Sequence, residues 1–140
     1  MDGLKRILFV DPDADLRREA AKILRENGFG FKDDYVLVEL GDHEIAEETF
    51  LRDRDFVAVI CELKGPNQEG PPASLAGFRV FRTVRHAVGY RIPLIVYTTN
   101  SRACEGGFDP DPTLGFVEKT EPEGLPEKLR DLLAEAQRWA

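Results

Sequence analysis

Short apolar runs alternate with helical patterns along this chain. Continuous apolar segments occupy residues 7–10, 56–60 and 94–97, and weaker segments of the same kind occupy residues 35–38 and 115–117. Apolar runs without polar alternation are typical of parallel strands that are covered on both faces. The pattern therefore predicts five strands of a parallel sheet.

Four segments between and after these strands carry apolar residues at the spacing of one helix face. The first begins after Asp13, a residue type that caps helices, and ends at Asn27, which precedes a glycine. The other three are expected over residues 42–51, 78–88 and 125–136. Strands that alternate with helices predict a doubly wound α/β fold with right-handed crossovers.

Two stretches depart from the regular alternation. Residues 64–74 are rich in proline and glycine and exceed the usual two to six residues of a strand–helix loop. Residues 99–114 should contain the fourth helix, but they include Gly106, Gly107 and two prolines. Both residue types are costly inside helices, so we expect the fourth helix to be short or degenerate.

Length and charge limit the functions that remain possible. A chain of 140 residues fits a single domain, residues 1–140, and it contains no apolar run long enough to span a membrane. The net charge of −7 argues against binding nucleic acid. Together with the absence of a signal-peptide pattern, these features predict a soluble, cytoplasmic protein. Cys61 and Cys104 are too few for a disulfide framework, and we expect Cys61 to be buried.

Other polar residues have simple structural interpretations. His43 and His86 are predicted to face solvent on helices, and neither is assigned to catalysis or to a metal site. Arg79, Arg82 and Arg85 are expected on the solvated face of the third helix. A patch that binds an acidic partner is the alternative interpretation of these arginines.

Candidate chemistry follows the ends of four strands. Asp11 comes after the first strand, Glu62 after the third, Thr98 after the fourth and Lys119 after the fifth. The carboxyl ends of strands in an open parallel sheet lie side by side, where such folds place their ligand sites. Two acids, a hydroxyl and an ammonium at one edge are typical of an ion-binding or phosphoryl-binding site. The alternative is that these are ordinary polar residues that end strands.

The chain resembles the receiver domain of bacterial response regulators over roughly residues 4–136. The order and spacing of several pieces carry this resemblance, rather than any one of them. The pieces are KRILFVDPDADLRREAAKILRENGF, DFVAVICELKGP, Gly77-Phe78 at the start of the third helix, IPLIVYTT and GFVEKTEPEGLPEKL. The resemblance implies a flavodoxin-like receiver topology and a role in two-component signalling.

The resemblance also implies roles for individual residues. In receiver domains an acidic pair after the first strand holds Mg²⁺, and an aspartate after the third strand accepts a phosphoryl group. A threonine and a lysine, here Thr98 and Lys119, then contact that phosphoryl group. An aromatic residue three positions before the lysine, here Phe116, commonly changes rotamer on activation.

Three positions depart from the receiver pattern. Glu62 occupies the phosphoacceptor position in place of aspartate, Pro12 replaces the second of two adjacent acids, and Thr120 replaces a proline after Lys119. The additional methylene of glutamate moves the carboxylate by roughly 1–1.5 Å, and misplacement on this scale can slow a reaction about 10²-fold. The remaining acids Asp11, Asp13 and Glu62 are expected to bind Mg²⁺ weakly or not at all.

Three classes of function follow from these features. The first is a pseudo-receiver without enzymatic activity or cofactor, which binds a protein partner through the surface near strands four and five without phosphorylation. The second, enzyme-like class is a working receiver that a histidine kinase phosphorylates in a phosphorelay. The third is a small nucleotide-binding or flavin-binding domain, against which the lack of a G-x-G-x-x-G or G-K-[ST] loop argues. The expected partner is a histidine kinase or an output protein.

One geometric expectation distinguishes two roles of Glu62. If Glu62 stands in for a phosphorylated aspartate, its carboxylate should lie within about 4 Å of the Lys119 ammonium. Thr98 should then turn inward toward the same carboxylate. If Glu62 is vestigial, its side chain should instead point into solvent.

Overall fold

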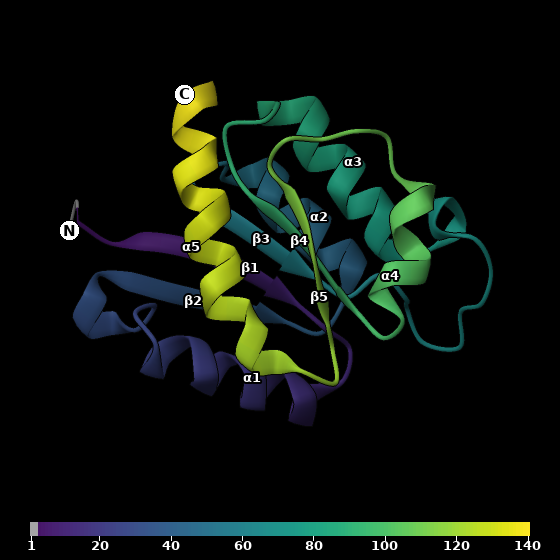
Figure 1. Cartoon of the computed structure of the whole chain (residues 1–140), viewed down its shortest axis with the longest axis horizontal. Coiled ribbons are helices and arrows are strands. Elements are labelled where there is room, and N and C mark those ends of the chain that lie inside the picture. Colours follow the sequence, from purple (N-terminus) through teal and green to yellow (C-terminus); the bar gives the residue numbers. More distant parts are fainter. Residues whose placement is uncertain (1–2) are drawn as a thin grey trace.

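A computed structural model describes residues 3–140 and contains one five-stranded parallel sheet (Figure 1). The strands are β1 (Lys5–Val10), β2 (Tyr35–Leu40), β3 (Ala58–Cys61), β4 (Leu94–Thr98) and β5 (Leu114–Glu118). The helices are α1 (Ala14–Glu26), α2 (His43–Arg52), α3 (Ala76–Val88), α4 (Ser101–Cys104) and α5 (Leu125–Ala136). The strand order is β2-β1-β3-β4-β5, which confirms the predicted doubly wound fold.

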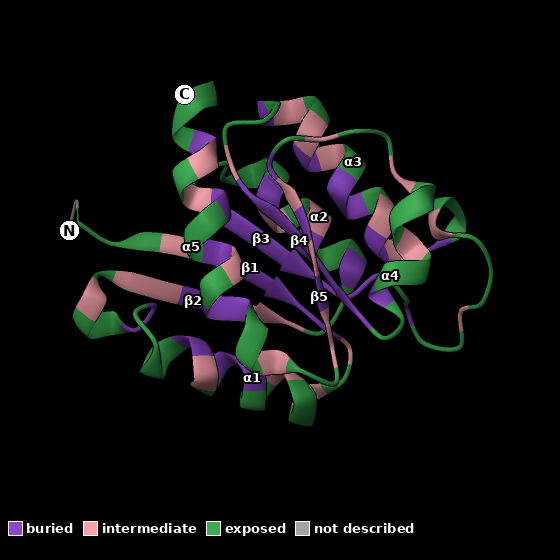
Figure 2. Cartoon of the chain, viewed as in Figure 1, coloured by how far each residue is buried: buried purple, intermediate pink, exposed green. Residues whose placement is uncertain are grey.

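The sheet separates two hydrophobic cores. Helices α1 and α5 pack against one face, and α2, α3 and the short α4 lie on the other (Figure 1). Every residue of β3 and β4 is buried, whereas the edge strand β2 is mostly half-buried (Figure 2). Coverage on both faces explains why the central strands are continuous apolar runs.

The third strand is shorter than its apolar run. Strand β3 begins at Ala58, so the predicted start of this strand at Phe56 is wrong. Phe56 is buried because its ring stacks on Phe50 at 6.0 Å between centroids, and the Arg6 guanidinium lies 4.2 Å from its centre. The apolar character of Phe56 therefore serves packing against α2 and not strand pairing.

Capping residues fix where the first two helices begin. The Asp13 carboxylate accepts a hydrogen bond from the Leu16 amide at 3.1 Å, and Asp42 accepts one from the Ile45 amide at 2.9 Å. Each bond satisfies an amide that the helix leaves without an internal partner. The cap at Asp13 was predicted, and it sets the path of the loop that leaves β1.

The fourth helix is short, as predicted. Helix α4 has four residues and continues into a single 3-10 turn, Glu105–Gly107. Gly107 lies against Pro72, and a Cβ atom at this glycine would approach the Pro72 ring to 2.5 Å. The close approach of this turn to the β3–α3 loop therefore requires a glycine where a regular helix would have continued.

Two of the three arginines on α3 lie on its solvated face. Arg79 and Arg82 are exposed, as predicted, but Arg85 is half-buried. The Arg85 guanidinium binds the Asp111 carboxylate, with Nε 2.6 Å from Oδ2 and Nη2 2.9 Å from Oδ1. The prediction for Arg85 is thus wrong, because its side chain joins α3 to the loop before β5. Across residues 3–140, no helix is long and apolar enough to cross a membrane.

Candidate functional site

Four polar side chains gather at the carboxyl ends of neighbouring strands. Asp11 follows β1, Glu62 follows β3, Thr98 ends β4 and Lys119 follows β5. Parallel pairing aligns these ends, with Val10 beside Cys61 and Cys61 beside Val96. All four side chains are at least nine-tenths buried. We call Asp11, Glu62, Thr98 and Lys119 the rim cluster.

The Lys119 ammonium lies between two carboxylates. Its Nζ atom is 2.9 Å from both carboxylate oxygens of Asp11 and 2.9 Å from Oε1 of Glu62. Burial alone would lower the pKa of Lys119, but its hydrogen bonds to Asp11 and Glu62 outweigh burial and raise this pKa above its ordinary value. The contact between Glu62 and Lys119 that the sequence led us to expect is therefore present.

Asp11 is the most deeply buried acid of the rim cluster. Its Oδ1 atom also accepts the Asp13 amide at 2.9 Å, whereas Oδ2 accepts no hydrogen bond from residues 3–140. Burial raises the pKa of Asp11, and the hydrogen bonds from Lys119 and Asp13 offset only part of this effect. Lys119 thus limits the rise in the pKa of Asp11 that burial causes.

The side chain and the backbone carbonyl of Glu62 are both held by neighbouring residues. Its Oε2 atom accepts the Lys64 amide at 3.2 Å, and its carbonyl oxygen accepts a hydrogen bond from His43 Nε2 at 2.7 Å. Gly77 packs against this carbonyl so closely that a Cβ atom there would lie 2.4 Å from it. These contacts direct the Glu62 side chain toward Lys119 and away from solvent.

The prediction that His43 faces solvent is wrong. His43 is the first residue of α2, is only 7% exposed, and donates to the Glu62 carbonyl. The prediction is wrong because the amino end of α2 packs onto the end of β3, a contact between segments that are distant in sequence. His86 is exposed, as predicted.

Asp13 does not join the acidic cluster. Its side chain is exposed and its carboxylate caps α1, so it cannot also point toward Glu62. The predicted acidic set of Asp11, Asp13 and Glu62 is therefore reduced to two carboxylates with an ammonium between them. Among residues 3–140, no three acids, histidines or cysteines come together as a group that could hold a metal ion. These two carboxylates do not fit Mg²⁺ as they stand, because the Lys119 ammonium already lies 2.9 Å from both of them and takes the place of a bound cation.

Within residues 3–140, neither the Thr98 nor the Phe116 side chain forms a hydrogen bond with the three charged residues of the rim cluster. Thr98 is buried, and its carbonyl accepts the Lys119 amide at 3.0 Å, but no hydrogen bond within residues 3–140 joins its hydroxyl to Glu62. Phe116 is half-buried, and its ring meets Phe108 edge to face at 5.4 Å. The expectation that the Thr98 side chain turns toward Glu62 therefore stays a prediction.

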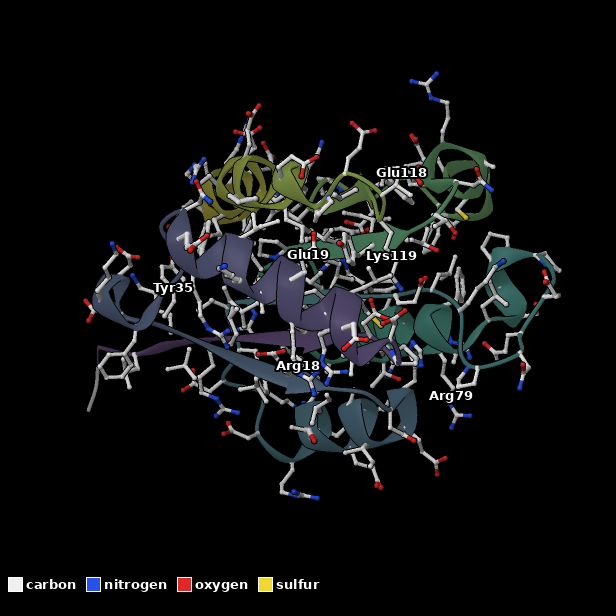
Figure 3. All side chains as sticks on the ribbon, turned by 90° about the horizontal axis from the view of Figure 1, so that it is seen from below. Arg18, Glu19, Tyr35, Arg79, Glu118 and Lys119 are labelled. Atoms are coloured by element: carbon white, nitrogen blue, oxygen red, sulfur yellow. The ribbon has the colours of Figure 1, made fainter. Side chains whose placement is uncertain are left out.

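Glu118 is a residue that the sequence analysis missed. Its carboxylate accepts the Asn100 amide at 2.9 Å, the Ser101 amide at 3.0 Å and the Ser101 hydroxyl at 3.1 Å. The Ser101 amide bond is the main cause that lowers the pKa of Glu118. Figure 3 shows Glu118 beside α4, with Lys119 further inside the molecule. Glu118 at the end of β5 and Lys119 directly after it thus fix the β4–α4 loop and the rim cluster.

The structure of the chain is similar to solved receiver domains. A response regulator receiver protein from Sinorhizobium medicae superimposes with a TM-score of 0.73 at 16% identity, over 95% of this chain and 97% of the other. A CheY-like receiver domain protein from Methanospirillum hungatei gives 0.69 at 19% identity, over 98% and 99%. The receiver domain of an HD domain-containing protein from Pseudomonas fluorescens gives 0.70 at 16% identity, over 99% and 93%.

Sequence comparisons find no related protein. No protein-family model matches the chain, and no curated protein matches it. At identities below 20%, the similarity to these three structures concerns the fold. The chain therefore has the receiver fold, with its rim cluster at the carboxyl ends of the strands.

Proposed function

We propose that this chain is a pseudo-receiver of two-component signalling, which binds a protein partner without being phosphorylated. The observation that carries the proposal is the Lys119 ammonium, which lies 2.9 Å from Glu62 and 2.9 Å from Asp11. In a working receiver, the lysine at this position contacts the incoming phosphoryl group. Here a carboxylate of the chain itself occupies that contact.

Electrostatics supports the same conclusion. The rim cluster already contains two buried carboxylates and one ammonium, so a phosphoryl group would add negative charge where one cation serves two acids. Like charges in a buried site disfavour one another strongly. In the part of the chain that the structure describes, residues 3–140, no third acid joins Asp11 and Glu62 to recruit a divalent cation that would offset this charge.

The surroundings of the cluster favour one fixed state. Glu118 holds the first residues of α4, and the Glu62 carbonyl is bonded by His43. A glutamate that pairs permanently with Lys119 would hold the β3 and β5 ends in one arrangement, as phosphorylation does transiently in a receiver. We infer that the partner binds this constant form of the domain, and that the partner is a histidine kinase or an output protein.

Phosphate incorporation from a small donor tests the proposal. Purified protein is incubated with acetyl phosphate and Mg²⁺, and intact mass is measured for the wild type, Glu62→Asp and Glu62→Gln. We expect no phosphoryl adduct on the wild type or on Glu62→Gln. Glu62→Asp should gain a measurable fraction, because the shorter side chain frees Lys119.

Stoichiometric modification of the wild type that disappears in Glu62→Gln would overturn the proposal and identify a working receiver. The same preparation also addresses the remaining class of function. An absorption band in the flavin region, or a nucleotide released on denaturation, would instead favour the small ligand-binding domain.

A further inference from the structure

A groove lies between the carboxyl-terminal halves of α2 and α3, away from the rim cluster. The two helices pack side by side on the same face of the sheet (Figure 1). The groove has a volume of about 580 Å³. Its lining residues are Leu51, Arg54, Arg82, Thr83, His86 and Ala87. We call it the α2–α3 groove.

The arginines of this groove are not neutralised by the chain. Arg54 and Arg82 are exposed, and neither forms an ion pair within residues 3–140. Two other arginines of α3 do form ion pairs. The Arg79 guanidinium lies 3.2 Å from the Glu47 carboxylate, and the Arg85 guanidinium lies 2.6 Å from the Asp111 carboxylate. Two full positive charges therefore border the groove of a protein whose net charge is −7.

Two acids near the groove, Glu47 and Asp53, are already engaged, whereas Asp55, next to Arg54, is exposed and forms no ion pair within residues 3–140. Glu47 accepts hydrogen bonds from the Thr83 hydroxyl at 2.9 Å and from Arg79. Asp53, adjacent to Arg54, is bonded to Arg6. Glu47 and Asp53 bind other residues and do not pair with Arg54 or Arg82, so both guanidinium groups are accessible to an external anion.

The groove also has an apolar component. Leu51 is 46% exposed and Ala87 is half-exposed, and both line the space that the two arginines border. Arginine is enriched in protein interfaces and among their hot-spot residues. A ligand that fits this surface carries carboxylates spaced around an apolar side chain, which is the chemistry of an acidic peptide segment.

We propose that the α2–α3 groove docks an acidic segment of a partner protein. Carboxylates of the segment pair with Arg54 and Arg82, and an apolar side chain between them contacts Leu51. A protein segment is favoured over nucleic acid because the rest of the chain is strongly acidic and repels an extended polyanion. This surface is separate from the rim cluster, so the inference does not depend on the state of Glu62.

The test uses a defined probe. A fluorescein-labelled peptide of about twelve residues, made of glutamate and aspartate around two leucines, is titrated with the full chain at low ionic strength. We expect saturable binding in fluorescence anisotropy that weakens with added salt. The double variant Arg54→Glu/Arg82→Glu should lose about tenfold or more in affinity, since two attractive pairs become repulsive.

A matched control variant separates the effect of the groove arginines from the effect of total charge on peptide binding. Lys22→Glu/Lys32→Glu makes the same change in total charge, at exposed residues of α1 and of the turn before β2. It should change the affinity less than about threefold. Leu51→Ser should weaken binding without changing charge, and Glu62→Gln should leave it unaltered. Circular dichroism checks that each variant is folded.

Several outcomes would overturn the inference. No saturable binding by the wild type would refute it, as would equal losses in the two double variants, which would show a general charge effect. Tighter binding of a single-stranded oligonucleotide than of the peptide, lost in the Arg54/Arg82 variant, would replace the protein segment with nucleic acid. A loss caused by Glu62→Gln alone would place binding at the rim cluster.

Discussion

Replacing Lys119 by methionine removes the one cation that the rim cluster contains. The lysine side chain is 9% exposed, and its Nζ atom lies 2.9 Å from each carboxylate. Methionine fills a similar volume and is apolar, so the change tests charge more than packing. It leaves Asp11, which is fully buried, facing Glu62 with the Asp13 amide as its remaining hydrogen bond.

The expected cost follows from the burial of these groups. Removing one partner of a buried ion pair costs about 3–5 kcal/mol of folding free energy, because the other charge is left without compensation. In the wild type the pKa of Asp11 is raised above 3.8 by burial, and the Lys119 hydrogen bond limits the rise. Without the lysine this pKa should rise further.

The direction in which pH changes the folding stability follows from the raised pKa of Asp11. An acid with a raised pKa in the folded state binds its proton more tightly when folded. Its contribution to stability is therefore complete below pH 3.8 and is lost as pH rises through the folded pKa. The larger shift in the variant makes this loss larger, so the difference in stability between wild type and Lys119→Met should be greatest near neutral pH.

Urea denaturation at about pH 7 and about pH 4 measures this difference. We expect Lys119→Met to be less stable by about 3–5 kcal/mol at neutral pH, and by clearly less at the acidic pH. The exposed Lys22→Met is the control and should change stability by less than about 0.5 kcal/mol. A Lys119→Met loss below about 1 kcal/mol at neutral pH, or an equal loss at both pH values, would refute the account of the cluster.

Three further predictions concern the surroundings of the rim cluster. Gly77→Ala should lower the free energy of unfolding by about 1–3 kcal/mol, measured by urea denaturation, because the added Cβ would meet the Glu62 carbonyl. This loss is expected although alanine has the better helix propensity. Gly106→Ala is the control and should leave the stability unchanged, because the space around Gly106 is open. Glu118→Ala should speed amide hydrogen exchange at Asn100 and Ser101, and unchanged exchange there would contradict its role as a cap. Mg²⁺ should bind with a dissociation constant of about 1 mM or weaker, and saturable calorimetric binding below about 100 µM would contradict this.

Local sequence patterns predicted most of the fold. Continuous apolar runs are enough to identify central strands, since both faces of the sheet are covered. The caps at Asp13 and Asp42 could be expected because a cap satisfies amides only a few residues away. The rim cluster could be anticipated as well, because parallel topology alone brings strand ends together.

Contacts between distant segments could not be predicted in the same way. Asp13 was expected both to cap α1 and to face Glu62, and only the backbone path decides that it caps. The burial of His43 depends on how α2 docks against the end of β3. Glu118 reaches Ser101, seventeen residues earlier, and no local pattern marks that pair.

Helix α2 connects the two surfaces discussed above. Its first residue, His43, donates to the Glu62 carbonyl, and Leu51 near its other end lines the α2–α3 groove. The helix has ten residues, which corresponds to about 15 Å. If Glu62 holds the rim cluster in one state, a signal must enter the domain elsewhere, and a partner in the groove would act on the same helix that supports Glu62. Binding of the acidic peptide should therefore slow hydrogen exchange along α2, while the pairing of Lys119 with Glu62 stays intact.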